Sequence, residues 1–130
     1  MTTTLGIRDQ RNEEAYGLEA QLNIANSVVG LVGTGSLAQF TAACLAGVGV
    51  RTLRIVGHER ITGKEREPLL LERTRGQPKI KEIKKTLEKI NEDADIFASA
   101  MSFQEWDMYP FRPQILIDAT NDPSSKKTLF

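Results

Sequence analysis

The stretch from Val28 to Arg60, VVGLVGTGSLAQFTAACLAGVGVRTLRIVGHER, constrains the fold more than any other part of the chain. An apolar run at 27–33 leads into a glycine turn, a helix of small residues is expected over Ser36–Leu45, and a second apolar run follows at 51–57. Strands that are apolar on both faces are typical of parallel sheets covered by helices. The pattern predicts a β-α-β unit with a right-handed crossover.

The same alternation of strand and helix continues toward the C-terminus. Further strands are expected in ADIFASAM (94–101) and PQILIDAT (113–120). Between the second and third strands, KIKEIKKTLEKI carries an apolar stripe at helical spacing, with Pro78 suited to the first helical position. Another helix is expected to begin in DPSSKKTLF (122–130), whereas HERITGKEREPLLLERTRG (58–76) is expected to be irregular.

A polar, helix-permissive segment precedes the first strand. Residues 1–26 are expected to form an N-terminal helical segment that breaks near Gly17. The predicted fold class is therefore α/β, a Rossmann-like three-layer fold with a mainly parallel sheet and a leading N-terminal helix. A chain of 130 residues suits a single domain, 1–130.

Composition narrows the cellular setting and the partners. The formal net charge is zero, so no long-range field favours nucleic acid or an acidic membrane. A single cysteine, Cys44, can form neither an internal disulfide nor a metal cluster, and its place inside a helix predicts a small buried residue rather than a nucleophile. No apolar run approaches the roughly 20 residues of a membrane span. We expect a soluble, cytoplasmic protein without nucleic-acid or membrane partners.

The glycine turn GTGSLA fits the G-x-G-x-x-G/A pattern. In that pattern the first glycine permits the turn, the second lets a phosphate approach the backbone, and the small last residue lets the helix pack on the strand. Gly33, Gly35 and Ser36 are therefore predicted to bind a nucleotide, with the helix amides facing an anion. The alternative is a small-residue helix packed on a sheet with nothing bound.

The end of the second strand departs from the usual nucleotide-binding pattern. Dinucleotide sites hold the ribose hydroxyls with an acid there, but this chain has Gly57 followed by His58 and Glu59. Glu59 is close enough in sequence to substitute for that acid. It can equally be a solvated loop charge.

Four collinear stretches resemble the ThiF, MoeB and HesA family, relatives of the ubiquitin-activating enzymes. GLEAQLNIANSVVGLVGTGSLAQ is similar to the family's G-x-E-x-Q helix and glycine-rich strand and turn, and LAGVGVRTLRIV to its next stretch. GQPKIKEIKKTLEKIN is similar to the family's G-x-x-K helix, and LIDATND to its D-x-T-D-N strand end. The resemblance implies an ATP- and magnesium-dependent adenylating fold that activates the C-terminal carboxylate of a small ubiquitin-like carrier protein. It also implies a homodimer or heterodimer.

The resemblance assigns roles to single residues. It implies that Lys79 meets the nucleotide phosphates and that Arg66, in the crossing loop, stabilises charge on the α-phosphate, with Arg73 and Arg75 as alternatives in another alignment. Without the resemblance, the favoured interpretation of Lys79 is a solvated lysine among its neighbours Lys81, Lys84 and Lys85.

Two further assignments concern the metal and the dimer. Asp118 is implied to help hold the magnesium ion, and the alternative is a polar cap at a strand end. Arg8 and Arg11 fall on an arginine pair of the leading helix, from which one arginine reaches the partner's ATP site in the family. Arg11, Arg66, Lys79 and Asp118 are thus the expected catalytic set.

Several departures from the family pattern leave the function open. Gly57 replaces the ribose-binding aspartate, the loop asparagine has no match, and Asn121-Asp122 inverts the usual order. Relative to the full family domain the chain is expected to be truncated. The first hypothesis is the ATP-binding part of an adenylyltransferase; the alternatives are a degenerate, non-catalytic subunit or interaction module, and an NAD or FAD module.

Overall fold

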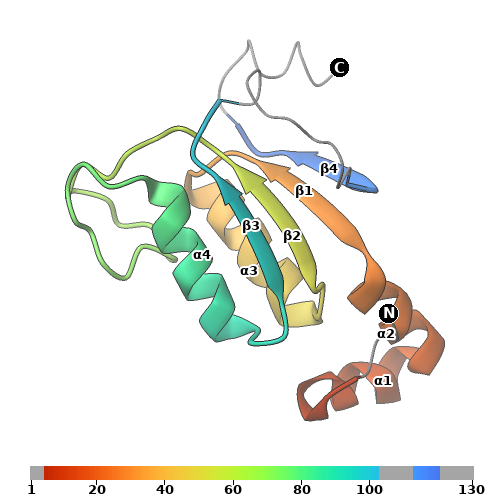
Figure 1. Cartoon of the computed structure of the whole chain (residues 1–130). Helices are drawn as coiled ribbons and strands as arrows, with labels where there is room; N and C mark the ends of the chain where they lie inside the picture. Colours follow the sequence, from red (N-terminus) through yellow and green to blue (C-terminus); the bar gives the residue numbers. More distant parts are fainter. Residues whose placement is uncertain (1–4, 103–112, 121–130) are drawn as a thin grey trace.

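A computed structural model describes residues 5–102 and 113–120. It contains a four-stranded sheet in the order β3-β2-β1-β4, and every pairing between these strands is parallel. Figure 1 shows the strands side by side with helices against them. The strands are β1 (Val28–Val32), β2 (Thr52–Val56), β3 (Asp95–Ser99) and β4 (Ile115–Asp118). The predicted α/β class with a mainly parallel sheet is confirmed.

Two short helices and a 3-10 turn precede the sheet. They are η1 (Ile7–Asp9), α1 (Gln10–Tyr16) and α2 (Leu18–Asn26). The break between α1 and α2 lies at Gly17, whose φ of 88° belongs to the left-handed region that glycine tolerates. The leading helical segment and its break therefore agree with the sequence pattern.

Two longer helices connect the first three strands, α3 (Ser36–Val48) and α4 (Lys79–Ile90). Helix α3 continues beyond the expected Leu45 and ends at Val48, with Gly49 as the residue that follows it. Pro78 is the residue before α4, with an extended ψ of 130°, so its placement at the first helical position was wrong. Proline needs no backbone donor there and still fixes the entry of the chain into the helix.

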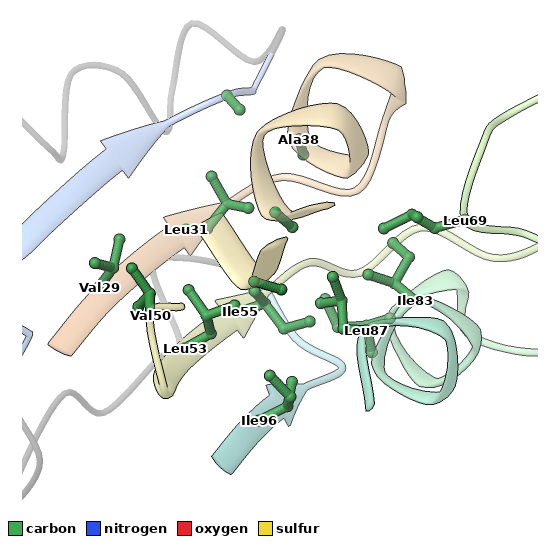
Figure 2. Packing of buried hydrophobic residues seen from close by; sticks show 14 of the residues in the cluster. Val29, Leu31, Ala38, Val50, Leu53, Ile55, Leu69, Ile83, Leu87 and Ile96 are labelled. Atoms are coloured by element: carbon green, nitrogen blue, oxygen red, sulfur yellow. The ribbon is translucent and has the colours of Figure 1, made fainter. Parts of the chain in front are cut away.

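The main core lies between one face of the sheet and both longer helices (Figure 2). Leu53 and Leu87, contributed by β2 and α4, are fully buried. Alanines face the sheet from α3, and the last position of that stripe is Ala46. Cys44 is on the outer side of the helix and exposed, so the prediction of a buried cysteine was wrong.

A smaller cluster lies apart from this core. It consists of Val32 and Val56, with Met101 and Leu116 packed against them. None of these four residues belongs to a helix. Within the described part of the chain, helices α3 and α4 therefore form one layer on the sheet, on the side of the main core. The helix expected from residue 122 onward, and Asn121-Asp122, lie outside the described residues.

The segment between β2 and α4 is irregular, as expected, but both of its ends are fixed. Arg60 and Pro78 form an isolated antiparallel bridge. The Ile61 amide donates to Gln77 O at 2.8 Å, and the Gly76 amide donates to Ile61 O at 2.7 Å. Leu69 and Leu70 are buried in the main core and fix the far part of the loop. This closure brings loop residues to the start of α4. In the described residues, no helix has the length and apolarity needed to cross a membrane.

Candidate nucleotide site at the carboxyl edge of the sheet

The candidate site lies where the parallel strands end. Ser99, Val56, Val32 and Asp118 form one row across the sheet in the observed register. The glycine turn follows Val32 directly. In open parallel sheets, ligands bind outside this carboxyl edge.

Gly33 and Gly35 differ in what a side chain would meet at each position. Gly33 has a φ of 124°, and a Cβ built there would lie 2.7 Å from Ala119 O. Its place is therefore set by the close approach of the chain after β4. Gly35 has ordinary backbone angles, and a Cβ there would meet no described atom within 4 Å. The space beside Gly35 is open, as the approach of a ligand requires.

The first turn of α3 presents unused amides beside that space. The Gln39 amide donates the first intrahelical bond, to Gly35 O at 3.0 Å. No described residue accepts a hydrogen bond from the amides of Gly35, Ser36 or Leu37. Such amides and the helix dipole favour an anion.

Lys79, at the start of α4, is already neutralised within the chain. It is 7% exposed. Its Nζ lies 3.2 Å from Glu59 Oε2 and 3.0 Å from each carboxylate oxygen of Glu67. The Lys79 backbone amide also donates to Glu59 O at 3.0 Å. The loop closure at the Arg60–Pro78 bridge explains how Glu59 reaches this position.

Gln39 connects the group formed by Lys79, Glu59 and Glu67 to the glycine turn. Its Nε2 donates to Thr34 O at 2.9 Å and to Glu67 Oε1 at 2.8 Å, and its Oε1 accepts the Leu69 amide at 2.9 Å. Gln39 is fully buried. The glycine turn, the crossing loop and α4 are therefore joined by one polar network.

Charge in this network opposes an incoming anion. Burial lowers the pKa of Lys79, but the hydrogen bonds to Glu67 and Glu59 outweigh burial and raise that pKa above its ordinary value. Lys79 is thus cationic at neutral pH. Two carboxylates around one ammonium leave a formal charge of −1, so a phosphate must compete with Glu59 and Glu67 for Lys79.

Asp118 closes the other side of the candidate site. Its Oδ1 accepts the Thr120 amide at 3.0 Å and the Thr120 hydroxyl at 2.6 Å, which orients the carboxylate at the end of β4. The described residues contain no group of three or more His, Cys, Asp or Glu side chains suited to a metal. One carboxylate still fits magnesium, which binds one or two protein carboxylates together with substrate phosphates and water.

The crossing-loop arginines differ in what they contact. Arg66 is exposed and has no hydrogen bond or ion pair with a described residue, whereas Arg73 Nε donates to Leu70 O at 3.3 Å. Arg66 follows a turn closed by Glu65, whose carboxylate accepts the Thr62 amide at 2.6 Å and the Thr62 hydroxyl at 2.7 Å. That amide bond is the main reason the pKa of Glu65 is lowered to about 2.

Arg8 and Arg11 belong to the opposite end of the sheet. Helix α1 lies near the amino end of β1 in Figure 1. Arg8 Nη1 donates to Ile90 O, the last residue of α4, at 2.6 Å. Arg11 is exposed. Within one chain, the structure does not bring Arg11 to the carboxyl edge.

Gln39 and Glu67 were missed by the sequence argument. A glutamine among the small, apolar residues of α3 was the one available signal. The position of Glu67 depends on loop closure, which no local pattern indicates.

Comparison with known proteins is consistent with this geometry. The ThiF family model matches residues 8–129. The chain belongs to the ThiF family. A tRNA threonylcarbamoyladenosine dehydratase of Bacillus subtilis (strain 168) is 34% identical over 97 residues, which are 73% of this ThiF-family chain and 38% of the relative.

Solved structures share the fold of this ThiF-family chain at low sequence identity. TcdA (CsdL) has a TM-score of 0.84 and 18% identity, over 98% of this chain and 54% of that one. An E. coli TcdA in complex with ATP has a TM-score of 0.76 and 16% identity, over 92% and 53%. E. coli MccB with succinimide has a TM-score of 0.79 and 21% identity, over 95% and 40%. The chain spans about half the length of these proteins or less.

Proposed function

We propose that this chain is the ATP-binding part of an adenylating protein. A substrate carboxylate oxygen attacks the ATP α-phosphorus, the bond to the β-phosphate oxygen breaks, and an acyl-adenylate and pyrophosphate result. The observation that carries the proposal is the open first turn of α3, where Gly35 has neither a backbone nor a packing reason to be glycine. A phosphate approaching the amides of Gly35 and Ser36 supplies that reason.

Positioning and charge stabilisation account for the proposed chemistry. Gly33, Gly35 and Ser36 form the turn against the phosphates, and Lys79 contacts them after leaving its carboxylate partners. Asp118 would hold magnesium, which neutralises phosphate charge when bound.

The two arginines have separate roles in this proposal. Arg66, in the crossing loop, stabilises charge on the α-phosphate. Its side chain is available for this role because no described group neutralises it. Arg11 acts on the site of a second copy or a homologous partner, since its own site lies at the other end of the sheet. The active form proposed here is therefore a homodimer or heterodimer, and the location proposed for it is the cytoplasm.

Two classes of larger molecule can supply the substrate carboxylate, a protein or a tRNA. The family resemblance favours the C-terminus of a small ubiquitin-like carrier protein. The named B. subtilis relative instead suggests a modified tRNA. The neutral net charge of the chain favours the protein substrate.

A non-catalytic module of the same fold is the second candidate. Its support is specific: Lys79 is paired with Glu59 and Glu67, and no acid occupies position 57. An NAD or FAD module is less well supported, because such sites read the ribose with the acid that is missing here and have no need of Lys79 and Asp118.

Calorimetric titration with ATP, NAD and FAD, each with and without magnesium, tests the proposal. We expect ATP with magnesium to bind and to raise the melting temperature by mass action, while NAD and FAD do so weakly or not at all. Gly35→Ala should weaken ATP binding. Stabilisation by NAD without any effect of ATP would contradict the proposal.

Exchange of labelled pyrophosphate into ATP separates the two candidates. Exchange that depends on a carrier protein or on tRNA identifies an adenylating enzyme and its substrate class. ATP binding without exchange in the presence of either favours the non-catalytic module.

A further inference from the structure

Gly57 and Thr34 exclude each other's side chains. Gly57 directly follows β2, and a Cβ built there would lie 2.2 Å from Thr34 Cγ2 and 3.3 Å from Thr34 Oγ1. Gly57 has no positive φ, so its backbone would accept other residues. The obstacle to an acid at position 57 is the threonine methyl group.

Both residues are held in place by hydrogen bonds. The Gly57 amide donates to Ser99 O at 3.1 Å, and Thr34 O accepts Gln39 Nε2 at 2.9 Å. The Thr34 side chain is buried, with the residue 2% exposed. Its Oγ1 has no partner among the described residues, so shape rather than hydrogen bonding accounts for its fit. The space of an acidic side chain is therefore filled by Thr34.

Glu59 is committed elsewhere. Its Oε2 lies 3.2 Å from Lys79 Nζ, and its backbone oxygen accepts the Lys79 amide. The backbone bond keeps Glu59 beside the start of α4 even when the Lys79 side chain turns to a phosphate, so the strand end itself carries no acid for the sugar.

We propose that the Thr34–Gly57 pair makes this site indifferent to the sugar hydroxyls, so that it accepts ribo- and 2′-deoxyribonucleoside triphosphates alike. Binding then depends on the phosphates and the base. This inference rests on the proposed ATP site and defines its ligand specificity.

The binding test compares ATP with 2′-deoxy-ATP by calorimetry at one magnesium concentration. For the wild type, the two dissociation constants should agree within about twofold. Thr34→Ala/Gly57→Asp removes the methyl group and adds the acid, and should favour ATP about tenfold, the effect of one hydrogen bond to a charged group. A wild-type preference for ATP above about twofold would overturn the inference. If Glu59→Gln abolished that preference, Glu59 would be the group that reads the sugar.

A folding test decides the steric part without any nucleotide. Denaturant midpoints are measured for Thr34→Ala, Gly57→Ala and the double variant. Gly57→Ala should lower the midpoint strongly in the wild-type chain and much less in the Thr34→Ala background. Thr34→Val keeps the methyl group and loses the hydroxyl, so Gly57→Ala should lower the midpoint as much in the Thr34→Val background as in the wild-type chain. Additive effects of Thr34→Ala and Gly57→Ala would refute the exclusion.

Absence of ATP binding by the wild type would overturn the proposed function and the sugar tolerance with it, and the folding result would still stand.

Discussion

The two ends of α3 are both bounded by glycines, yet their backbone groups are satisfied in different ways. At the C-terminal end, Asn12 Nδ2 and Gln21 Nε2 each donate to Val48 O at 3.0 Å, and Asn91 Nδ2 donates to Ala46 O at 3.2 Å. At the N-terminal end, the amides of Gly35 and Ser36 have no described acceptor.

This difference separates residues that hold the fold from residues that can hold a ligand. Gln21 and Asn91 belong to the motifs that relate the chain to its family, but both cap the closed end of α3. Asn12 and Gln21 thereby tie the leading helices to the end of α3. Only the open end, with Gly35 at its start, retains backbone donors for a nucleotide among the described residues of this helix.

The largest expected effect comes from the pair Gly33 and Gly35. Gly33→Ala should destabilise folding by about 2–5 kcal/mol, because it adds left-handed strain and a clash with the Ala119 backbone. Gly35→Ala should leave folding within about 1 kcal/mol and should instead weaken ATP binding. Denaturant unfolding and calorimetry measure the two effects. Equal loss of stability in both variants would remove the distinction between the two glycines.

The closed end of α3 gives a matched test that should affect stability alone. Gly49 has a φ of 109°, and a Cβ there would lie 2.7 Å from Gln21 Nε2. Gly49→Ala should therefore destabilise folding by about 2–4 kcal/mol. Gly47→Ala is the control, since a Cβ inside the helix there meets no described atom within 4 Å, and it should stabilise by about 0.5–1 kcal/mol.

The nucleotide affinity of these two variants completes the comparison. Neither should change the dissociation constant for ATP beyond about twofold, given that both lie at the far end of the helix from the open amides. A clear loss of ATP affinity in folded Gly49→Ala would show that the two ends are coupled.

The sequence was sufficient for the elements whose signal is local. Apolar runs located the four described strands, and Gly17 located the break in the leading segment. The glycine turn was recognisable because strand, turn and helix follow one another directly. Asp118 is the last residue of β4, within the strand expected at 113–120, whereas its magnesium role was implied by the family resemblance and stays a prediction.

Contacts made across the fold were beyond local patterns. Small and apolar residues occupy every side of α3, so the helix phase that exposes Cys44 could not be read from hydrophobicity. Glu67 meets Lys79 only after the loop closes at Arg60 and Pro78. The exclusion between Thr34 and Gly57 likewise arises from the packing of two strand ends.

A smaller effect is expected at Lys79, whose charge is already paired with Glu59 and Glu67. Glu67→Gln removes one carboxylate charge from Lys79 and should cost about 1–3 kcal/mol of folding stability. The same change should tighten ATP binding roughly threefold to tenfold, because the phosphates compete with one carboxylate fewer.

Glu59→Gln is the matched control for this prediction. The Glu59 side chain is 54% exposed, against 12% for Glu67, so water screens its charge more effectively. Its effects on stability and on affinity should both be smaller than those of Glu67→Gln. Weaker ATP binding in Glu67→Gln would indicate that Glu67 positions Lys79 for the phosphates instead of withholding it.

The smallest expected effect concerns the Thr62–Glu65 turn, which directly precedes Arg66 in the crossing loop. The lowered pKa of Glu65, about 2 against an ordinary 4.5, means that the folded chain favours the carboxylate form. Its contribution to stability is complete above pH 4.5 and is lost as the pH falls from about 4.5 to about 2. The difference in melting temperature between wild type and Glu65→Gln should therefore shrink across this window. Glu72→Gln, at an exposed position without a described partner, should follow the wild-type curve. A carboxyl titration by NMR that placed Glu65 at its ordinary pKa would contradict the hydrogen-bonded turn and would leave Arg66 without a fixed origin beside the candidate site.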